Sequence, residues 1–228
     1  MNSQHPDLFE KVLVKLTDAD ESFALLHQII RETPENSFFI SGGIVRDILM
    51  GGHNRIKDID IFLTSAGLAK IEPFLKANGK VHTNQFGTKR WFPGNAKELY
   101  YDIIEISRFR NGLWPCRDMN DVLNQFDITA NSVAFDLASG KFYNPQNGLD
   151  DINNRVLRAV RFDYPEMLVS DDIPISRNSV LWFRYHFYAS KLGFEIEPIT
   201  KKWIDDNSFR SEDLEKFKKY FFDPYKVL

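Results

Sequence analysis

The stretch of sequence that decides the fold is FISGGIVRDILMGGHNRIKDIDIF, residues 39–62. The apolar run at 38–40 predicts a short buried strand, which leads into a Gly-Gly pair at 42–43. Residues 44–50 have the apolar spacing of a helix, whereas residues 58–62 alternate between polar and apolar side chains, as a half-buried strand does. We therefore expect a strand, a glycine turn, a helix and a second strand, in this order.

Asp58 and Asp60 carry the strongest chemical signal of this stretch. Side chains two residues apart on a strand point to the same face, so the two carboxylates project together and Ile59 points to the opposite, buried face. Adjacent carboxylates repel each other unless a cation neutralises them, and hard oxygen ligands suit Mg²⁺ or Mn²⁺. Phosphoryl transfer uses such a site. An isolated Asp-x-Asp pair is more often a solvated strand edge, and this alternative stays open for the pair alone.

The segment Ser41, Gly42 and Gly43 follows the first strand and opens the helix. Paired glycines let backbone N–H groups approach a phosphate without a Cβ in the way, and a helix N-terminus attracts anions. Arg46 lies in the first turn, where it is a candidate for contact with the same phosphates, and Asp47 is expected to pair locally. The alternative is a tight strand-to-helix turn without a ligand. In combination with the aspartate pair, the turn predicts a phosphate cradle beside a metal site.

The bulk properties are those of an ordinary soluble globular protein, with 228 residues, 43% hydrophobic and 27% charged. No apolar run is long enough to span a bilayer, and the N-terminus has no secretory apolar segment, so we expect a cytoplasmic protein. Cys116 is the only cysteine, which excludes an internal disulfide and a four-cysteine zinc site. The net charge of −3 argues against a long basic grip on nucleic acid and favours a local or metal-assisted one.

The same patterns predict the remaining elements. Residues 6–31 read as one or two amphipathic helices with a break at 17–20. Further predicted elements are a helix over 67–77 capped by Ser65, strands over 81–83, 90–92 and 103–109, a turn and short strand at 140–143, and helices from 176 onward. We expect a head domain over 1–160 and a helical neck over 161–228.

Residues 39–62 resemble the signature of the class II tRNA nucleotidyltransferase and bacterial poly(A) polymerase family, roughly GGxVRDxLLG followed by DxD. The loop before Asp58 is about two residues longer here. Similar segments continue in the family's order: the FGT turn at 86–88, EISRFR at 105–110, QFDITANSVAFD at 125–136, the turn at 144–151 and the helix at 182–194. The resemblance implies an α+β fold: a polymerase-β-like head, with a mixed sheet flanked by helices, followed by a short helical neck.

The resemblance also implies roles for individual residues. Asp58 and Asp60 are the implied metal ligands, and Glu105 is the candidate third carboxylate, with a surface or salt-bridged glutamate as the alternative. Asp127 is expected to contact the ribose or to orient its neighbours, with a helix or turn cap as the alternative. The candidate nucleotide-binding residues are Ser41, Gly42, Gly43, Arg46, Arg110, Asp127, Asn131, Arg177 and Arg184.

The implied activity is transfer of a nucleoside monophosphate from a nucleoside triphosphate, ATP or CTP, to the 3′-hydroxyl of an RNA such as tRNA, with release of pyrophosphate. Two alternatives stay open. The first is nucleotidyl transfer to a protein or small molecule, and the second is a non-catalytic module that binds nucleotide or RNA.

The sequence departs from the family at the triphosphate. The family has two arginines before the motif aspartate, and they are expected to bind the triphosphate and position that aspartate. Here these positions hold Gln125 and Phe126. Arg110 and Lys89 are the candidates that could compensate for the two lost charges.

A second departure concerns the base. The family reads the incoming base with an E-D-x-x-R motif at the start of the neck helix, and those positions hold Arg177, Asn178 and Leu181 here. The acidic pair at 171–172, followed by Arg177, replaces the motif only with shifted spacing. We therefore expect different or relaxed base selectivity.

Arg177, Arg184 and Lys191 are spaced by seven, which indicates either a basic stripe along the nucleotide cleft or a solvated helix face. Only about thirty residues follow the neck match, with a small basic end. The family's body and tail domains hold the tRNA acceptor stem, and the sequence leaves open whether this chain alone completes a tRNA 3′ end.

Overall fold

A computed structural model describes residues 5–35, 37–52, 56–94 and 98–226, with only the backbone at 110–112. The chain forms two compact units. The sheet unit is Met1–Asn124 with Asn131–Gln146, and the helical unit is Gln125–Ala130 with Asn147–Leu228. The domain boundary that we placed at residue 160 stays a prediction. In the described ranges, no helix is long and apolar enough to cross a membrane.

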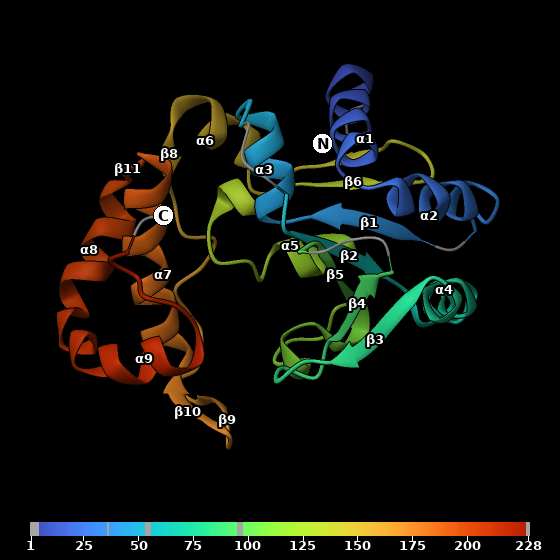
Figure 1. The fold of residues 1–228 in the computed structure, drawn as a ribbon. Coiled ribbons are helices and arrows are strands. Elements are labelled where there is room, and N and C mark those ends of the chain that lie inside the picture. The colour runs from blue at the N-terminus through green and yellow to red at the C-terminus, as the bar shows by residue number, and fades with distance from the viewer. Residues whose placement is uncertain (1–4, 36, 53–55, 95–97, 227–228) are drawn as a thin grey trace. The chain divides into compact units, whose positions relative to one another are not determined.

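The sheet unit is built on a mixed sheet (Figure 1). Its strands are β1 (Phe38–Ser41), β2 (Asp58–Leu63), β3 (Gly79–Thr83), β4 (Lys89–Pro93), β5 (Tyr100–Glu105), β6 (Ala134–Asp136) and β7 (Phe142–Tyr143). They lie in the order β3-β4-β5-β2-β1-β6-β7. The pairing of β2 with β5 is parallel, whereas the other pairings within this sheet are antiparallel. The mixed sheet flanked by helices that we expected is therefore confirmed.

The helices of this unit are α1 (Pro6–Ala19), α2 (Glu21–Arg31), α3 (Gly43–Leu49), α4 (Ser65–Ala77) and α5 (Met119–Leu123). The predicted break between the first two occurs at Asp20, whose extended backbone ends α1 and whose side chain caps α2 by accepting from the Ser22 N–H. Such a cap stabilises a helix by about 1 kcal/mol.

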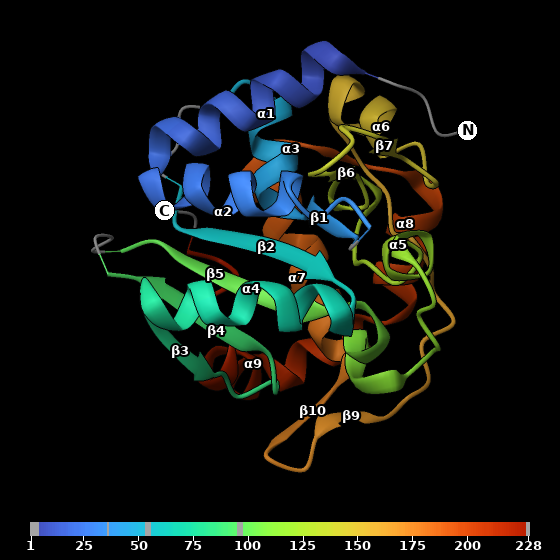
Figure 2. The ribbon, with the colours of Figure 1, turned by 90° about the vertical axis from the view of Figure 1, so that its right-hand side faces the viewer.

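Helices α2 and α4 lie on the same side of the sheet (Figure 2), and we call this side the core face. Trp91 and Tyr101 are fully buried there. The Trp91 indole N–H donates to the Leu75 carbonyl of α4 over 2.9 Å, and the Tyr101 hydroxyl donates to the Asp20 carboxylate over 2.5 Å. Burying a large apolar side chain stabilises a fold by roughly 1.5–3 kcal/mol, and these hydrogen bonds also pin the covering helices to β4 and β5.

Two local predictions were wrong. The cap of α4 is Thr64, which accepts from the Gly67 N–H, and Ser65 is the first helical residue. The strand predicted over 103–109 ends at Glu105, and a 3-10 helix, Ile106–Gly112, follows it. Alternating side chains continue across this junction in the sequence, so the pattern alone does not reveal where the strand stops.

The helical unit contains α6 (Gly148–Asn154), α7 (Arg177–Leu192), α8 (Pro198–Asp206) and α9 (Leu214–Tyr220), and it also contains β8 (Val156–Leu157), β9 (Leu168–Ser170), β10 (Ile173–Ser176) and β11 (Glu195–Ile196). The expected helices from 176 onward are confirmed, whereas the β9–β10 hairpin was not predicted. Helix α7 packs Phe183 against Phe217 of α9, with ring centroids 4.8 Å apart, and the Trp182 indole N–H donates to the Ile204 carbonyl of α8.

Candidate active site

The candidate site begins at Asp58 and Asp60 on the sheet side opposite the core face. Asp58 is exposed and Asp60 is half-buried, whereas Ile59 between them is fully buried. The prediction that the two carboxylates project together, away from Ile59, is confirmed. Asp60 lies beside Ser41 of β1 on one side and beside Asp102 of β5 on the other. We call this side of the sheet the carboxylate face.

Asp102 is a third carboxylate on this face that the sequence did not lead us to name. Both of its oxygens accept from Arg90 of β4, over 2.8 Å each, and the guanidinium lies 3.9 Å from the centroid of the Tyr100 ring. The hydrogen bond to Asp102 is the main cause that raises the pKa of Arg90, and the charge of Asp58 adds to it. The alternation of Tyr101, Asp102 and Ile103 was the available signal, but we began this strand at residue 103, three residues after its start at Tyr100.

Glu105 is not brought to the aspartate pair. It pairs with Leu63, whose side chain is fully buried on the core face. Paired residues point to the same side of a sheet, so Glu105 points away from the carboxylate face. Its carboxylate accepts from the Ser65 hydroxyl over 2.7 Å and lies 3.6 Å from Arg108. This is the salt-bridged alternative, and the third carboxylate beside the pair is Asp102.

The glycine turn is shaped by Gly42, which has φ 84° and ψ −155° and precedes α3. A side chain is strained at this backbone conformation. Ser41 is fully buried, and its hydroxyl donates to the Val133 carbonyl over 2.8 Å. A Cβ on Gly43 would lie 3.3 Å from the guanidinium of Arg46. The turn is thus held tightly from both sides.

Arg46 lies under this turn and is only 2% exposed. It donates to the Asn131 amide oxygen over 2.5 Å and to Asp47 over 2.7 Å and 2.6 Å. The local pairing that we expected for Asp47 is confirmed. We predicted that Arg46 contacts phosphates directly, and its burial instead fits a residue that positions the turn. Asn131 is brought to the site as its acceptor.

In the helical unit, Asp127 is 2% exposed and pairs with Arg184 of α7. One carboxylate oxygen accepts from Arg184 over 2.8 Å and 2.6 Å, and the other accepts from the Ile128 N–H. Arg184 also donates to the Tyr188 hydroxyl over 2.9 Å. The interpretation that Asp127 orients a neighbour therefore agrees with its contacts.

The other neck residues have separate contacts. Arg177 donates to the Val169 carbonyl over 3.4 Å, and Lys191 lies 5.5 Å from the Phe187 ring centroid. Asn178, in the base-reading register, donates to Glu166 over 2.7 Å. Arg177, Arg184 and Lys191, which we aligned as a possible basic stripe, therefore contact three different groups.

The two positions that replace the family's arginines are buried, and compensation by Arg110 or Lys89 stays a prediction. Gln125 and Phe126 are buried, at 2% and 8% exposed. Lys89 is 3.0 Å from Glu72 of α4, and the side chain of Arg110 lies outside the described residues. Arg90 is the cation that lies beside Asp102 on the carboxylate face.

The donor set fits a magnesium ion that also binds substrate. Among the described residues no group of three His, Cys, Asp or Glu side chains could hold a metal by itself. Asp58 and Asp60 offer two hard oxygen donors, and Mg²⁺ is usually held by one or two carboxylates together with waters and substrate phosphates.

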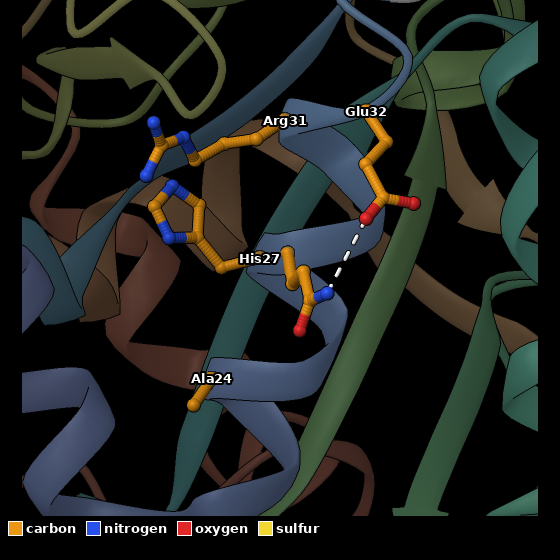
Figure 3. Close-up of a pocket in the computed structure, with 5 residues that line it drawn as sticks. Ala24, His27, Arg31 and Glu32 are labelled. Carbon is orange, nitrogen blue, oxygen red and sulfur yellow. Dashed lines mark hydrogen bonds between the residues drawn. The ribbon is translucent and has the colours of Figure 1, made fainter.

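A pocket elsewhere on the sheet unit is lined by Ala24, His27, Gln28 and Arg31 of α2 and by Glu32, the residue that follows this helix (Figure 3). A hydrogen bond of 3.3 Å joins Gln28 to Glu32 across it. Burial lowers the pKa of His27, whose ring contacts the Leu137 carbonyl over 2.8 Å. None of the predicted site residues whose side chains the structure describes lines this pocket.

Curated relatives and solved structures agree with the resemblance that the motifs indicated. The CCA-adding enzyme of Staphylococcus aureus strain MRSA252 is 32% identical over 152 residues, which are 60% of this chain and 35% of that enzyme. The Thermotoga maritima CCA-adding enzyme complexed with tRNA matches with a TM-score of 0.72 at 20% identity, over 100% of this chain and 52% of that one. A CCA-adding enzyme with ATP has a TM-score of 0.67 at 19% identity, over 96% and 50%. The polymerase-β-like head with a helical neck is therefore confirmed as the fold, although this chain spans only about a third to a half of these proteins.

A family model matches a larger part of the chain than the curated relative does. This model, described as the Gabija anti-defense 2 family, covers residues 8–155, which include both aspartates, Asp102 and the glycine turn. The chain belongs to the Gabija anti-defense 2 family.

Proposed function

We propose that this protein is a nucleotidyltransferase that moves a nucleoside monophosphate from ATP or CTP to the 3′-hydroxyl of an RNA and releases pyrophosphate. The observation that carries the proposal is the carboxylate face. Asp58 and Asp60 project from the same side of β2. Asp60 lies beside Asp102 of β5 and beside Ser41, the residue that precedes the glycine turn. The CCA-adding enzymes that share the fold support the class of reaction.

In this proposal Asp58 and Asp60 hold the divalent metal. Bound Mg²⁺ would supply Lewis-acid chemistry, because it neutralises triphosphate charge and lowers the pKa of an attacking hydroxyl. Asp102 has a different role from its neighbours, since Arg90 occupies both of its oxygens. The ion pair with Asp102 fixes the Arg90 guanidinium on the carboxylate face, where the N–H groups that Asp102 does not occupy can donate to triphosphate oxygens.

Several further residues act by holding the backbone in place. Arg46 connects the glycine turn to Asn131, and Ser41 connects it to Val133. Backbone N–H groups of the turn are then available to the phosphates. In the helical unit, Asp127 holds the guanidinium of Arg184 through two hydrogen bonds, and Arg184 is the nucleotide contact that we propose there.

The proposal is tested with the purified protein, Mg²⁺, each ribonucleoside triphosphate labelled at the α-phosphate, and pooled tRNA or a single-stranded RNA. We expect label on the RNA and release of pyrophosphate, both abolished by EDTA and by Asp58→Asn. Asp18→Asn, an exposed carboxylate on α1, is the matched control and keeps full activity. An absence of labelled RNA with every triphosphate overturns transfer to RNA.

The family description favours a second candidate for the acceptor. It names an action against a defence, and the matched residues 8–155 are the ones that carry the aspartates. The same transfer reaction is then directed at a protein or small molecule of that defence instead of at tRNA.

The two candidates are separated by following the label. Labelled triphosphate is added to extracts of cells that carry Gabija, and RNA, protein and small molecules are separated. Label on protein or metabolite, and none on RNA, favours the second candidate. Label confined to RNA rules it out. Under both candidates, we expect the Asp58→Asn variant to lose its action against the Gabija defence when cells produce it.

A further inference from the structure

The carboxylate face continues from the aspartates across three more strands to the sheet edge. Residues paired across neighbouring strands point to the same face, so the register identifies the members of this surface. Asp58 pairs with Tyr100 of β5, and His82 of β3 pairs with Arg90 of β4. The members beyond the carboxylates are Lys80, His82, Arg90, Phe92 and Tyr100, and we call them the aromatic platform.

Aromatic rings form a continuous row on this platform. Phe92 lies 5.8 Å from the His82 ring on one side and 5.8 Å from the Tyr100 ring on the other. The guanidinium of Arg90 lies 3.9 Å from the centroid of the Tyr100 ring. The row therefore runs from the edge strand β3 to the residue beside Asp58.

The platform is open to solvent, unlike the core face of the same strands. Phe92 is 37% exposed, whereas the preceding residue, Trp91, points to the core face and is fully buried. Lys80 and His82 are also exposed. An exposed phenylalanine flanked by a lysine, a histidine and an arginine has the composition of a surface that stacks bases and contacts phosphates.

We propose that the aromatic platform binds the single-stranded 3′ segment of a nucleic-acid acceptor, with bases stacked on Phe92 and the terminal hydroxyl at Asp58. This inference rests on the proposed function and names the surface that holds its acceptor. Neighbouring strands are about 4.8 Å apart, so the path from β3 to β2 is roughly 14 Å, which accommodates a few nucleotides.

Charge and shape both select a single strand. The chain carries a net charge of −3, which disfavours a broad electrostatic grip, and stacking is the source of affinity that does not need excess positive charge. Bases in a duplex are already stacked on one another, so only an unpaired segment can use the platform. Lys80 and His82 at the sheet edge are placed to contact the backbone phosphates.

The test measures binding of a fluorescent single-stranded RNA octamer by anisotropy, with EDTA and no nucleotide present. We expect Phe92→Ala to weaken binding about tenfold and Phe92→Trp to preserve it, because base stacking on an aromatic ring contributes roughly this factor. Leu25→Ala, an equally simple truncation of an exposed side chain on α2, is the control and leaves binding unchanged. A thermal melt checks that each variant is folded.

The results separate this inference from the proposed function. Equal affinity of wild type and Phe92→Ala, or equal affinity for duplex and single strand, overturns the platform even if transfer is observed. Binding that depends on Phe92 supports the platform even if no nucleotide is transferred, and in that case the transfer proposal alone fails.

Discussion

The carboxylate face of the sheet unit and helix α7 of the helical unit use polar side chains in opposite ways. On the sheet, Asp58 is exposed and Asp60 is half-buried, at the surface of a strand whose other side is fully buried. On the helix, Arg184 is paired with buried Asp127, and Asn178 donates to Glu166. The two carboxylates thus lie at the surface of the sheet unit, whereas Arg184 and Asn178 pair with carboxylates of their own unit.

The residues that we propose for the reaction lie on the sheet unit, whereas the positions that correspond to the family's base reader lie on α7. Asp58 and Asp60 are the aspartates that we propose for phosphoryl transfer, whereas the family's base-reading positions on α7 hold Arg177, Asn178 and Leu181. In that register Asn178 donates its amide N–H groups to Glu166 and to the Tyr164 carbonyl. Altered base selectivity stays a prediction, and the contacts of Asn178 give it a physical reason.

The largest expected effect is the loss of nucleotidyl transfer when an aspartate of the carboxylate face is replaced. Asp58→Asn or Asp60→Asn should reduce transfer by about a thousandfold or more, because each removes a metal-binding charge from the reacting phosphates. Stability should stay equal or rise, since two like charges no longer repel. Rates of labelled transfer and thermal melts check both expectations, and a variant with full activity would remove the aspartates from the proposed site.

Removing one arginine from each unit tests how the burial of the remaining carboxylate affects the free energy of unfolding. Arg184→Met leaves the Asp127 carboxylate, 2% exposed, without its cation, and should cost about 3 kcal/mol of unfolding free energy. Arg46→Met leaves Asp47, 30% exposed and able to find water, and should cost about 2 kcal/mol. Urea denaturation measures both. Adding Asp127→Asn to Arg184→Met should recover part of the loss, and no recovery would show that the pair is not the cause.

A backbone change at the glycine turn has a smaller effect. Gly42→Ala should destabilise the fold by roughly 1–2 kcal/mol, because φ is 84° there and an L-residue is strained in that region. Gly87→Ala, with φ 78° and nothing near its Cβ, is the matched control in an exposed turn. If transfer falls with Gly42→Ala by more than the fraction unfolded explains, the turn also contacts substrate.

The smallest effect belongs to the helical unit and depends on pH. The hydrogen bond from Arg210 lowers the pKa of Glu166 to about 2 from 4.5. Because the folded pKa is depressed, the stabilisation is present above pH 4.5 and is lost as the pH falls toward 2. Glu166 is 56% exposed, so solvent screening keeps the effect small. Melting temperatures of wild type and Glu166→Gln should differ at pH 6 and converge near pH 2, and a constant difference would contradict this.

The sequence by itself determined the order of elements and the faces of single strands. The side-chain period of a strand is two, so Asp58, Ile59 and Asp60 reveal which side is buried without any knowledge of their neighbours. The Gly-Gly pair, the helix that follows and the helices from 176 onward are local patterns of the same kind. The family's motif order then identified the polymerase-β-like head.

Only the tertiary structure decided which residues meet across strands. Asp102 lies beside Asp60 because β5 pairs with β2 in one particular register, and a shift by one residue would have brought a residue of the other parity there. That register depends on how Trp91 and Tyr101 pack under α4 and α2, which no local pattern encodes. The same reason applies to Arg46, whose charge suggested a ligand and whose side chain is buried against Asn131 and Asp47.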